Sequence, residues 1–260
     1  MDKHPSESMN MADTMTDSAT DKAMPRGLSL AQNGFNLSAI ASPSAVDQQG
    51  ELSFQLTNPN GSPLTEYKLS HEKDLHLIVV RSDGAEFKHV HPATNGRGGW
   101  SIPWKWNKAG TYRVFTDFVP AQLGEDVTLT RTVEVAGNYE PVPINGDTSE
   151  TVVEDYKVEL RGKLTAGTSS TLSFTVSKNG QPVTTLEPYL GAYGHLVALR
   201  QGDLAYLHVH PLGEPANKAA TSGPTVQFMT EVPTSGTYLL YLDFQVGGTV
   251  HTAPFIVTAT

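Results

Sequence analysis

Six of the nine histidines in this 260-residue chain belong to one short pattern that occurs twice. The members of the two copies are His76, His89 and His91, and then His195, His208 and His210. In both copies the second histidine lies 13 positions after the first, and the third comes two positions later. Three imidazoles brought together most often hold a metal ion, so the pattern predicts a three-histidine metal site in each copy.

The first copy is expected to form a β-hairpin that gathers its histidines. Asp83-Gly84 is a strong signal for a two-residue turn. Such a turn pairs Ile78 with His89 and His76 with His91. Because side chains alternate across a strand, all three imidazoles then share one face with apolar residues.

The second copy leads to the same arrangement from different turn residues. A turn at Gly202-Asp203 places His195 opposite His210. In both hairpins we expect the histidine face to point into the core of its own module. The opposite face, which carries Arg81 and Lys88 in the first copy, is then expected to face solvent.

Two aspartates are candidates for a fourth ligand. Asp117 and Asp243 each end a strand that begins with Gly-Thr-Tyr, and each shares its face with an aromatic residue two positions earlier. An aspartate on an inward face needs a partner, which would be either the metal or one of its ligands. The alternative is an aspartate at a strand end that bonds to a neighbouring turn. His71 and His251 have no counterpart in the other copy and are expected to be surface histidines.

Composition excludes several kinds of site. The chain has no cysteine, which removes disulfides, thiolate zinc sites, iron–sulfur clusters and the blue-copper site. A net charge of -9 without a basic cluster argues against nucleic acid as a partner. The apolar runs have strand length and are far shorter than the roughly 20 residues of a transmembrane helix.

The pattern of short apolar runs and turn residues predicts an all-β protein. After Pro25, short alternating runs are separated by turn signals such as Asn58-Pro59-Asn60-Gly61 and Lys178-Asn179-Gly180. We expect two tandem immunoglobulin-like or cupredoxin-like β-sandwiches, at 27–137 and 151–260, joined by a linker at 138–150. Strands are predicted at 35–41, 51–57, 75–81, 86–91, 110–118 and 128–135, and again at 156–160, 170–177, 195–200, 205–210, 236–245 and 249–258.

The first 26 residues are expected to be a disordered tail. They are polar, contain His4 and include the methionines Met1, Met9, Met11, Met15 and Met24. The thioethers could bind Cu(I), or the tail could be a solvated linker. No signal peptide is visible, and the segment is similar to the stretch just after the processing site of an exported protein or lipoprotein.

The histidine phrases resemble those of a known group of proteins. Leu75–Arg81, Phe87–Pro92, Tyr189–Val197 and Leu207–Pro211 are similar to secreted bacterial proteins described as heavy-metal-binding or heavy-metal-associated domain proteins. The stretch from Gly236 to Phe255 also resembles immunoglobulin-like modules of the FixH and YtkA type. The resemblance implies an extracytoplasmic location and copper handling, although the chain lacks the cysteine pair of heavy-metal-associated domains.

Three functions are hypotheses at this point. The first is an extracytoplasmic protein that captures, buffers or delivers a metal ion, with copper favoured over zinc and a membrane metal transporter or another metal-handling protein as its partner. The second is a redox enzyme with a superoxide dismutase-like or mononuclear copper or zinc site. The third is a structural assembly module in which the histidines are core imidazoles bonded to backbone and no metal binds.

Overall fold

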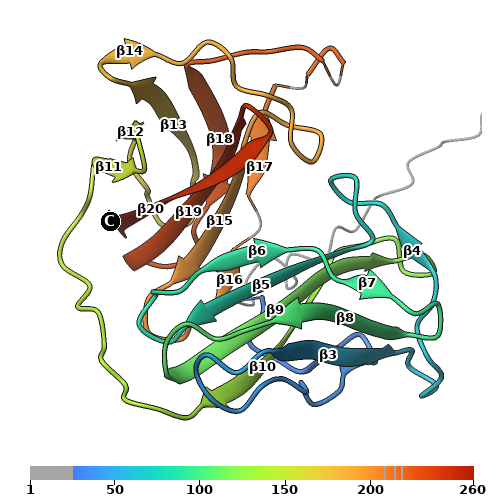
Figure 1. Cartoon of the computed structure of the whole chain (residues 1–260). Coiled ribbons are helices and arrows are strands. Elements are labelled where there is room, and N and C mark those ends of the chain that lie inside the picture. Colours follow the sequence, from blue (N-terminus) through green and yellow to red (C-terminus); the bar gives the residue numbers. More distant parts are fainter. Residues whose placement is uncertain (1–25, 208, 214, 218) are drawn as a thin grey trace, which may run out of the picture.

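All regular structure in the described part of the chain is β-strand, arranged in four sheets (Figure 1). The computed structural model describes residues 26–207, 209–213, 215–217 and 219–260. Within these ranges no helix is long and apolar enough to cross a membrane. The predicted disordered tail, with its methionines and His4, falls on residues 1–25 and so lies outside the described residues, except for Arg26.

Module one is built from two facing sheets. The strands of its first sheet, in spatial order, are β1 (Ala31–Gln32), β2 (Phe35–Leu37), β3 (Gly50–Thr57), β8 (Gly99–Trp104) and β7 (Ala93–Thr94). The strands of its second sheet are β10 (Val127–Val135), β9 (Gly110–Pro120), β5 (Leu75–Arg81) and β6 (Lys88–Val90), with β4 (Tyr67–Lys68) added along β9. The module is an antiparallel, immunoglobulin-like sandwich.

Module two repeats this plan. The strands of its first sheet are β11 (Glu150–Val153), β12 (Tyr156–Arg161), β13 (Ser169–Lys178), β18 (Thr225–Glu231) and β17 (His210–Leu212), with β14 (Gln181–Pro182) along β13. The strands of its second sheet are β16 (Tyr206–Leu207), β15 (His195–Arg200), β19 (Gly236–Val246) and β20 (Thr249–Ala259). The chain is therefore a tandem pair of β-sandwiches, as the sequence predicts.

Each sandwich has its own core, formed by alternate residues of its strands. Leu52 and Phe54 of β3 point inward against Leu77 and Val79 of β5, together with Trp100 and other residues of module one. A separate cluster fills module two. This alternation places the odd-numbered positions of β5 in the core of module one.

The even-numbered positions of β5 face the other module. Ile78 and Val80 belong to a third apolar cluster, which also contains Val197 and Leu199 of β15. All seven residues of β5 are consequently buried, because apolar partners cover both faces of the strand. Figure 1 shows the sheet of β15 and β16 lying against the sheet of β5 and β6.

The contact between the modules is nearly symmetric. Phe87 stacks on Tyr241, with ring centroids 3.9 Å apart, and Phe115 lies 5.8 Å from Tyr206. Phe87 and Tyr206 occupy equivalent positions in the two copies, as do Phe115 and Tyr241. The same pair of contacts is thus made twice with the modules exchanged, which is the pattern of a two-fold interface.

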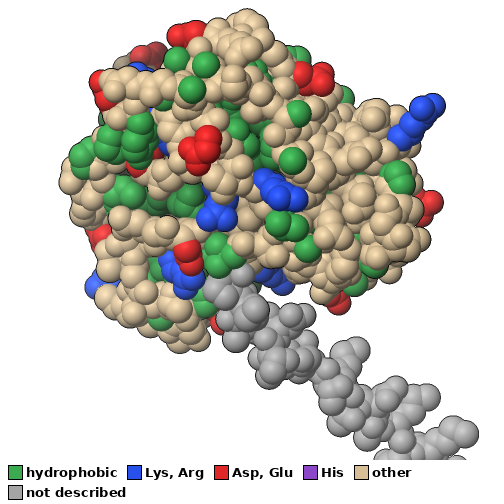
Figure 2. Space-filling view, turned by 90° about the horizontal axis from the view of Figure 1, so that it is seen from below, with side chains coloured by type: hydrophobic (Ala, Val, Ile, Leu, Met, Phe, Trp, Pro, Cys, Tyr) green, Lys and Arg blue, Asp and Glu red, His purple; other side chains and the backbone are tan. Residues whose placement is uncertain are grey.

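This packing corrects the predicted orientation of the hairpins. The histidine face of each hairpin points toward the other module and not into its own core. The expectation that Arg81 faces solvent is also wrong, since only 2% of Arg81 is exposed and its guanidinium bonds to Asp83 at 2.7 Å. On the outer surface, the face in Figure 2 shows basic and acidic side chains interspersed.

Candidate metal centre

Three imidazoles of module one meet at the edge of the interface. His76 lies on β5, His89 on β6, and His91 comes directly after β6. His76 Nδ1 is 3.0 Å from His89 Nε2 and 3.1 Å from His91 Nε2. One nitrogen from each ring lies within 4.8 Å of the other two. The predicted pairing of Ile78 with His89 is confirmed, which is why the rings share a face.

Hydrogen bonds to the far sides of two rings fix where their protons sit. His76 Nε2 is 2.9 Å from the carbonyl oxygen of Ser70, which can only accept, so Nε2 carries the hydrogen. His89 Nδ1 is 2.8 Å from a carboxylate oxygen of Asp243 and is likewise the donor. In the neutral rings, His76 Nδ1 and His89 Nε2 are therefore both acceptors, and they face one another.

Two lone pairs do not face each other at 3.0 Å unless a hydrogen or a metal ion lies between them. A hydrogen on His91 Nε2 can satisfy only one of these acceptors. A metal ion satisfies all three rings at once. Tetrahedral coordination with metal–nitrogen bonds of about 2.05 Å places the ligand nitrogens about 3.3 Å apart, which is close to the observed separations.

Asp243 reaches this cluster from module two. Its Oδ2 accepts from His89 Nδ1, and its Oδ1 accepts from Thr252 Oγ1 at 2.5 Å. Asp243 is 2% exposed, and the contact joins two buried side chains. A carboxylate that holds the distal nitrogen of a ligating imidazole fixes its tautomer and its orientation. The structure thus places Asp243 behind His89.

Asp117 holds the equivalent position on β9, directly opposite His76. Its Oδ1 accepts from Thr128 Oγ1 at 2.7 Å. Its Oδ2 lies 3.4 Å from the hydroxyl of Tyr206 in module two. Both aspartates therefore turn one oxygen toward a threonine of the neighbouring strand and the other toward the opposite module.

The second copy is only partly described. His195 lies opposite Asp243, and its Nε2 is 2.9 Å from the carbonyl oxygen of Tyr189, six residues earlier. His76 contacts Ser70 O at the same sequence separation. The predicted register is confirmed where Leu199 pairs with Tyr206.

The predicted pairing of His195 with His210 is wrong. Strand β16 ends at Leu207, and the chain then crosses to the other sheet, where His210 pairs with Met229 of β18. His208 lies outside the described residues.

Two further histidines depart from the expectation that they lie on the surface. His251 is buried in module two, 5% exposed, with its ring 4.6 Å from that of Tyr156. His71 is half-buried beside the metal centre, with its ring centroid 4.9 Å from that of His195 and 6.0 Å from that of His76. Sequence reasoning missed His71 because it stands outside the duplicated spacing.

A small cavity lies among these side chains. It measures about 30 Å³ and is lined by His71, His76, His89, Asp117 and His195, together with Leu196, Val197, Tyr206 and Val209. Its size is close to that of one water molecule or one ion.

Burial keeps two of the imidazoles in their neutral, metal-binding form. Removal from water, with help from His89 and His76, lowers the pKa of His91 to about 2. Burial, and after it the influence of His71 and His89, lowers the pKa of His195 to about 3. Both rings consequently offer a lone pair at neutral pH.

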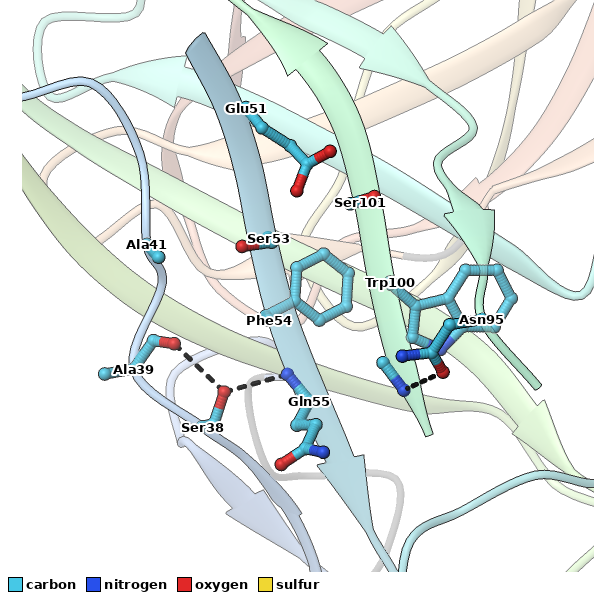
Figure 3. Close-up of a pocket in the computed structure, with 11 residues that line it drawn as sticks. Ser38, Ala39, Ala41, Glu51, Ser53, Phe54, Gln55, Asn95, Trp100 and Ser101 are labelled. Carbon is cyan, nitrogen blue, oxygen red and sulfur yellow. Dashed lines mark hydrogen bonds between the residues drawn. The ribbon is translucent and has the colours of Figure 1, made fainter. Parts of the chain in front are cut away.

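A larger groove lies elsewhere and has different chemistry. It measures about 380 Å³ and runs over the first sheet of module one, between Ser53 and Gln55 of β3 and the segment with Ser38 and Ala41 (Figure 3). Ser38 Oγ accepts from the backbone NH of Gln55 at 2.8 Å there. Hydroxyl, amide and one carboxylate group line this groove, and no histidine does. The groove therefore plays no part in the candidate metal centre.

Comparison with solved structures finds remote resemblances. A Salmonella alpha-2-macroglobulin aligns over 94% of the chain, at 12% identity and a TM-score of 0.28, and the chain spans 15% of that protein. The D0-D1 domains of intimin align over 86% of the chain and 95% of their own length, at 13% identity and a TM-score of 0.23. Domains 5–6 of the S-layer protein SbsC align over 86% of the chain and 98% of their own length, at 15% identity and a TM-score of 0.25.

Comparison with families is more informative than comparison with single proteins. No curated protein matches the chain. One family model matches residues 31–137 and again residues 150–260, so it covers both modules. The chain belongs to the family described as Domain of unknown function (DUF8832), with one copy of the domain in each module.

Proposed function

We propose that this protein binds a metal ion with His76, His89 and His91, at a site that is completed by Asp243 across the module interface. The observation that carries the proposal is the convergence of acceptor nitrogens. His76 Nδ1 and His89 Nε2 lie 3.0 Å apart while the other nitrogen of each ring is committed to a protein acceptor. A site made only of structural imidazoles would pair each acceptor with a donor.

Copper is the ion we propose, with zinc as the alternative. Neutral imidazoles suit both metals, and the general order of affinities favours copper where both are free. The triangle has three nitrogen ligands and no carboxylate, which disfavours magnesium and calcium, since both prefer oxygen ligands.

The role we propose is capture, buffering or delivery of the ion outside the cytoplasm. The basis is the resemblance of the histidine phrases to secreted heavy-metal-binding proteins. A membrane metal transporter or another metal-handling protein is the partner that this role requires. Fractionation of cells that express the full-length natural protein tests the location, and recovery in the cytoplasm would contradict it.

Metal analysis of protein purified without added metal tests the binding. We expect the wild-type chain to retain or take up copper, and the double variant His89→Ala/His91→Ala to lose the ion of this site. The double variant His208→Ala/His210→Ala measures the contribution of the second copy. Unchanged stoichiometry in the first variant would refute the site, and turnover of superoxide or oxygen by the copper-loaded protein would contradict a non-catalytic role.

A further inference from the structure

The segment that leads into module one also contacts module two. The backbone NH of Tyr206, on β16, donates to the carbonyl oxygen of Arg26 at 2.9 Å. Three residues later, the carbonyl oxygen of Ser29 accepts from the backbone NH of Thr130, on β10 of module one, at 2.8 Å. Strands β16 and β10 are the outer strands of their sheets, so residues 26–30 join an edge of one module to an edge of the other. We call residues 26–30 the strap.

Gly27 fits the strap closely to the module interface. It is buried, and its φ of +68° lies in the left-handed region. A Cβ at this position would lie 2.7 Å from the Cβ of Tyr206 and 3.1 Å from the ring of Phe115. Phe115 and Tyr206 form one of the two ring contacts between the modules. Glycine therefore allows the strap backbone to approach the interface this closely.

The segment that leads into module two makes an equivalent crossing. The backbone NH of Val142 donates to Asp83 Oδ2, in the first hairpin turn, at 2.8 Å. Ile144 packs against the interface cluster, and the backbone NH of Thr148 donates at 2.8 Å to the carbonyl oxygen of Ile256, on β20. Each entering segment thus passes the other module's hairpin before it joins its own module. The strap repeats a feature of the duplicated fold.

The strap is held less firmly than the strands that it joins. Leu28 and Leu30 are 38% and 43% exposed, and Gly27 has no side chain to bury. Elements with few buried apolar contacts open locally before the rest of a protein does. Opening would remove the bond to Tyr206 and leave the sheets of both modules intact.

We propose that the strap holds the two modules in the arrangement that binds the ion, and that its release lets the modules part and weakens the site. This inference rests on the proposed function, because the effect on the ion passes through the contact between His89 and Asp243 across the interface. When the modules part, His89 loses the carboxylate that orients it. The three histidines of the triangle then hold the ion less tightly, although all of them remain in module one.

A pair of glycine variants of the full chain tests the strap. Gly27→Ala puts a Cβ against Tyr206 and Phe115, whereas Gly61→Ala is the matched control, because Gly61 has a φ of +82° and no heavy atom within 4 Å of the added Cβ. Both variants share the backbone strain, and only the first adds the clash. We expect Gly27→Ala to have a larger radius of gyration in small-angle X-ray scattering and a Cu(II) affinity about 10-fold lower. Gly61→Ala should match the wild-type chain in both, and circular dichroism confirms that each variant is folded.

A measurement on the wild-type chain needs no variant. If opening of the strap weakens binding of the ion, then by linkage the bound ion must favour the closed strap. We expect Cu(II) loading to slow hydrogen exchange at the amide of Tyr206, which donates to Arg26. The amide of Val183, which donates to Val176 within the first sheet of module two, should exchange at an unchanged rate.

The outcomes separate the strap from the metal site. An equal radius of gyration in Gly27→Ala and the wild-type chain would refute the strap and leave the metal site standing. A larger radius with unchanged Cu(II) affinity, or no protection of the Tyr206 amide by Cu(II), would refute its control of the ion. If the wild-type chain binds no copper, the proposed function fails, and scattering alone then decides whether the strap holds the modules together.

Discussion

The two modules carry the same histidine pattern but use it differently. In each module the first histidine donates its Nε2 to a carbonyl six residues earlier, and in each it lies opposite an aspartate on the neighbouring strand. In module one, two more imidazoles of the same hairpin close on His76. In module two, the described imidazoles beside His195 are His71 and His89, both from module one.

The difference indicates that the proposed metal centre depends on both modules. Asp243 of module two holds His89 of module one, and Tyr241 of module two donates to the carbonyl of Gly84 at 2.6 Å in the first hairpin turn. Because the duplicated hairpin faces pack against each other, the carboxylate of Asp243 lies next to His89 of the other module. Module one therefore supplies the three clustered histidines, and module two supplies contacts that orient their hairpin.

The largest expected effect on copper content comes from changing the first histidine of module one, and the same change in module two is its comparison. His76→Gln removes the nitrogen at the centre of the triangle, so we expect loss of the ion held by His89 and His91. His195→Gln should leave that ion in place, because His195 is not part of the triangle. Copper content by mass spectrometry, measured on both variants, checks this. Identical losses in the two variants would show that the ion is not held by the triangle of module one alone.

Breaking the interface should weaken the centre without touching a ligand. Tyr241 is buried and stacks on Phe87, so Tyr241→Ala should lower the free energy of unfolding by about 3 kcal/mol. Copper affinity should fall as well, because the His89–Asp243 contact depends on the same packing. Tyr241→Phe keeps the ring and should lose only about 1 kcal/mol. Urea unfolding and copper titration measure both, and unchanged affinity in Tyr241→Ala would place the centre within module one alone.

Asp243→Asn tests the carboxylate behind His89. The substitution keeps the size of the side chain and removes its charge, so His89 loses its charge-assisted partner. We expect copper affinity to fall by roughly 10- to 100-fold, the usual effect of losing such a residue. Isothermal titration measures it. An affinity equal to that of the wild-type chain would mean that Asp243 has only a structural role.

The smallest expected effect is on the pH dependence of the metal-free protein. The pKa of His195 is about 3 in the folded chain and near its ordinary value of 6.5 when unfolded. Below pH 6.5 the unfolded chain therefore binds a proton that the folded chain does not, and stability falls as the pH drops toward 3.

Between about pH 6.5 and about pH 5.5 this single group should cost about 1 kcal/mol. Urea unfolding at the two pH values measures the loss, and His195→Gln should make it smaller. If the loss of unfolding free energy between these pH values is unchanged in His195→Gln, then His195 is accessible to protons in the folded state.

Much of the fold can be predicted from the sequence. The predicted hairpin registers are confirmed at Ile78 and His89 and at Leu199 and Tyr206, because turn length and alternation fix which residues pair. The long strands β8 and β18 are missing from the predicted set. Pro103 interrupts the pattern in β8. Strand β18 alternates clearly, with its even-numbered residues buried, and Ser222-Gly223-Pro224 marks a turn before it, so this strand could have been predicted from the sequence.

The interface could not be predicted in the same way. Both faces of β5 are apolar, and alternation alone does not say which face meets the module's own core and which meets another module. The sequence prediction turns the histidine face toward the module's own core. The positions of Asp243 and His71 could not be predicted from it, because their partners lie across the interface. The extra apolar residues Ile78 and Val80 on the histidine face are the available signal.

Anomalous diffraction from crystals of the copper-loaded protein tests whether the triangle holds the ion. The account predicts an anomalous peak about 2.0 Å from the imidazole nitrogens of His76, His89 and His91, with Asp243 still bonded to His89 Nδ1. Two results would contradict this prediction. One is the absence of any peak at the triangle, and the other is a peak bound by residues of one module while His89 and Asp243 are apart.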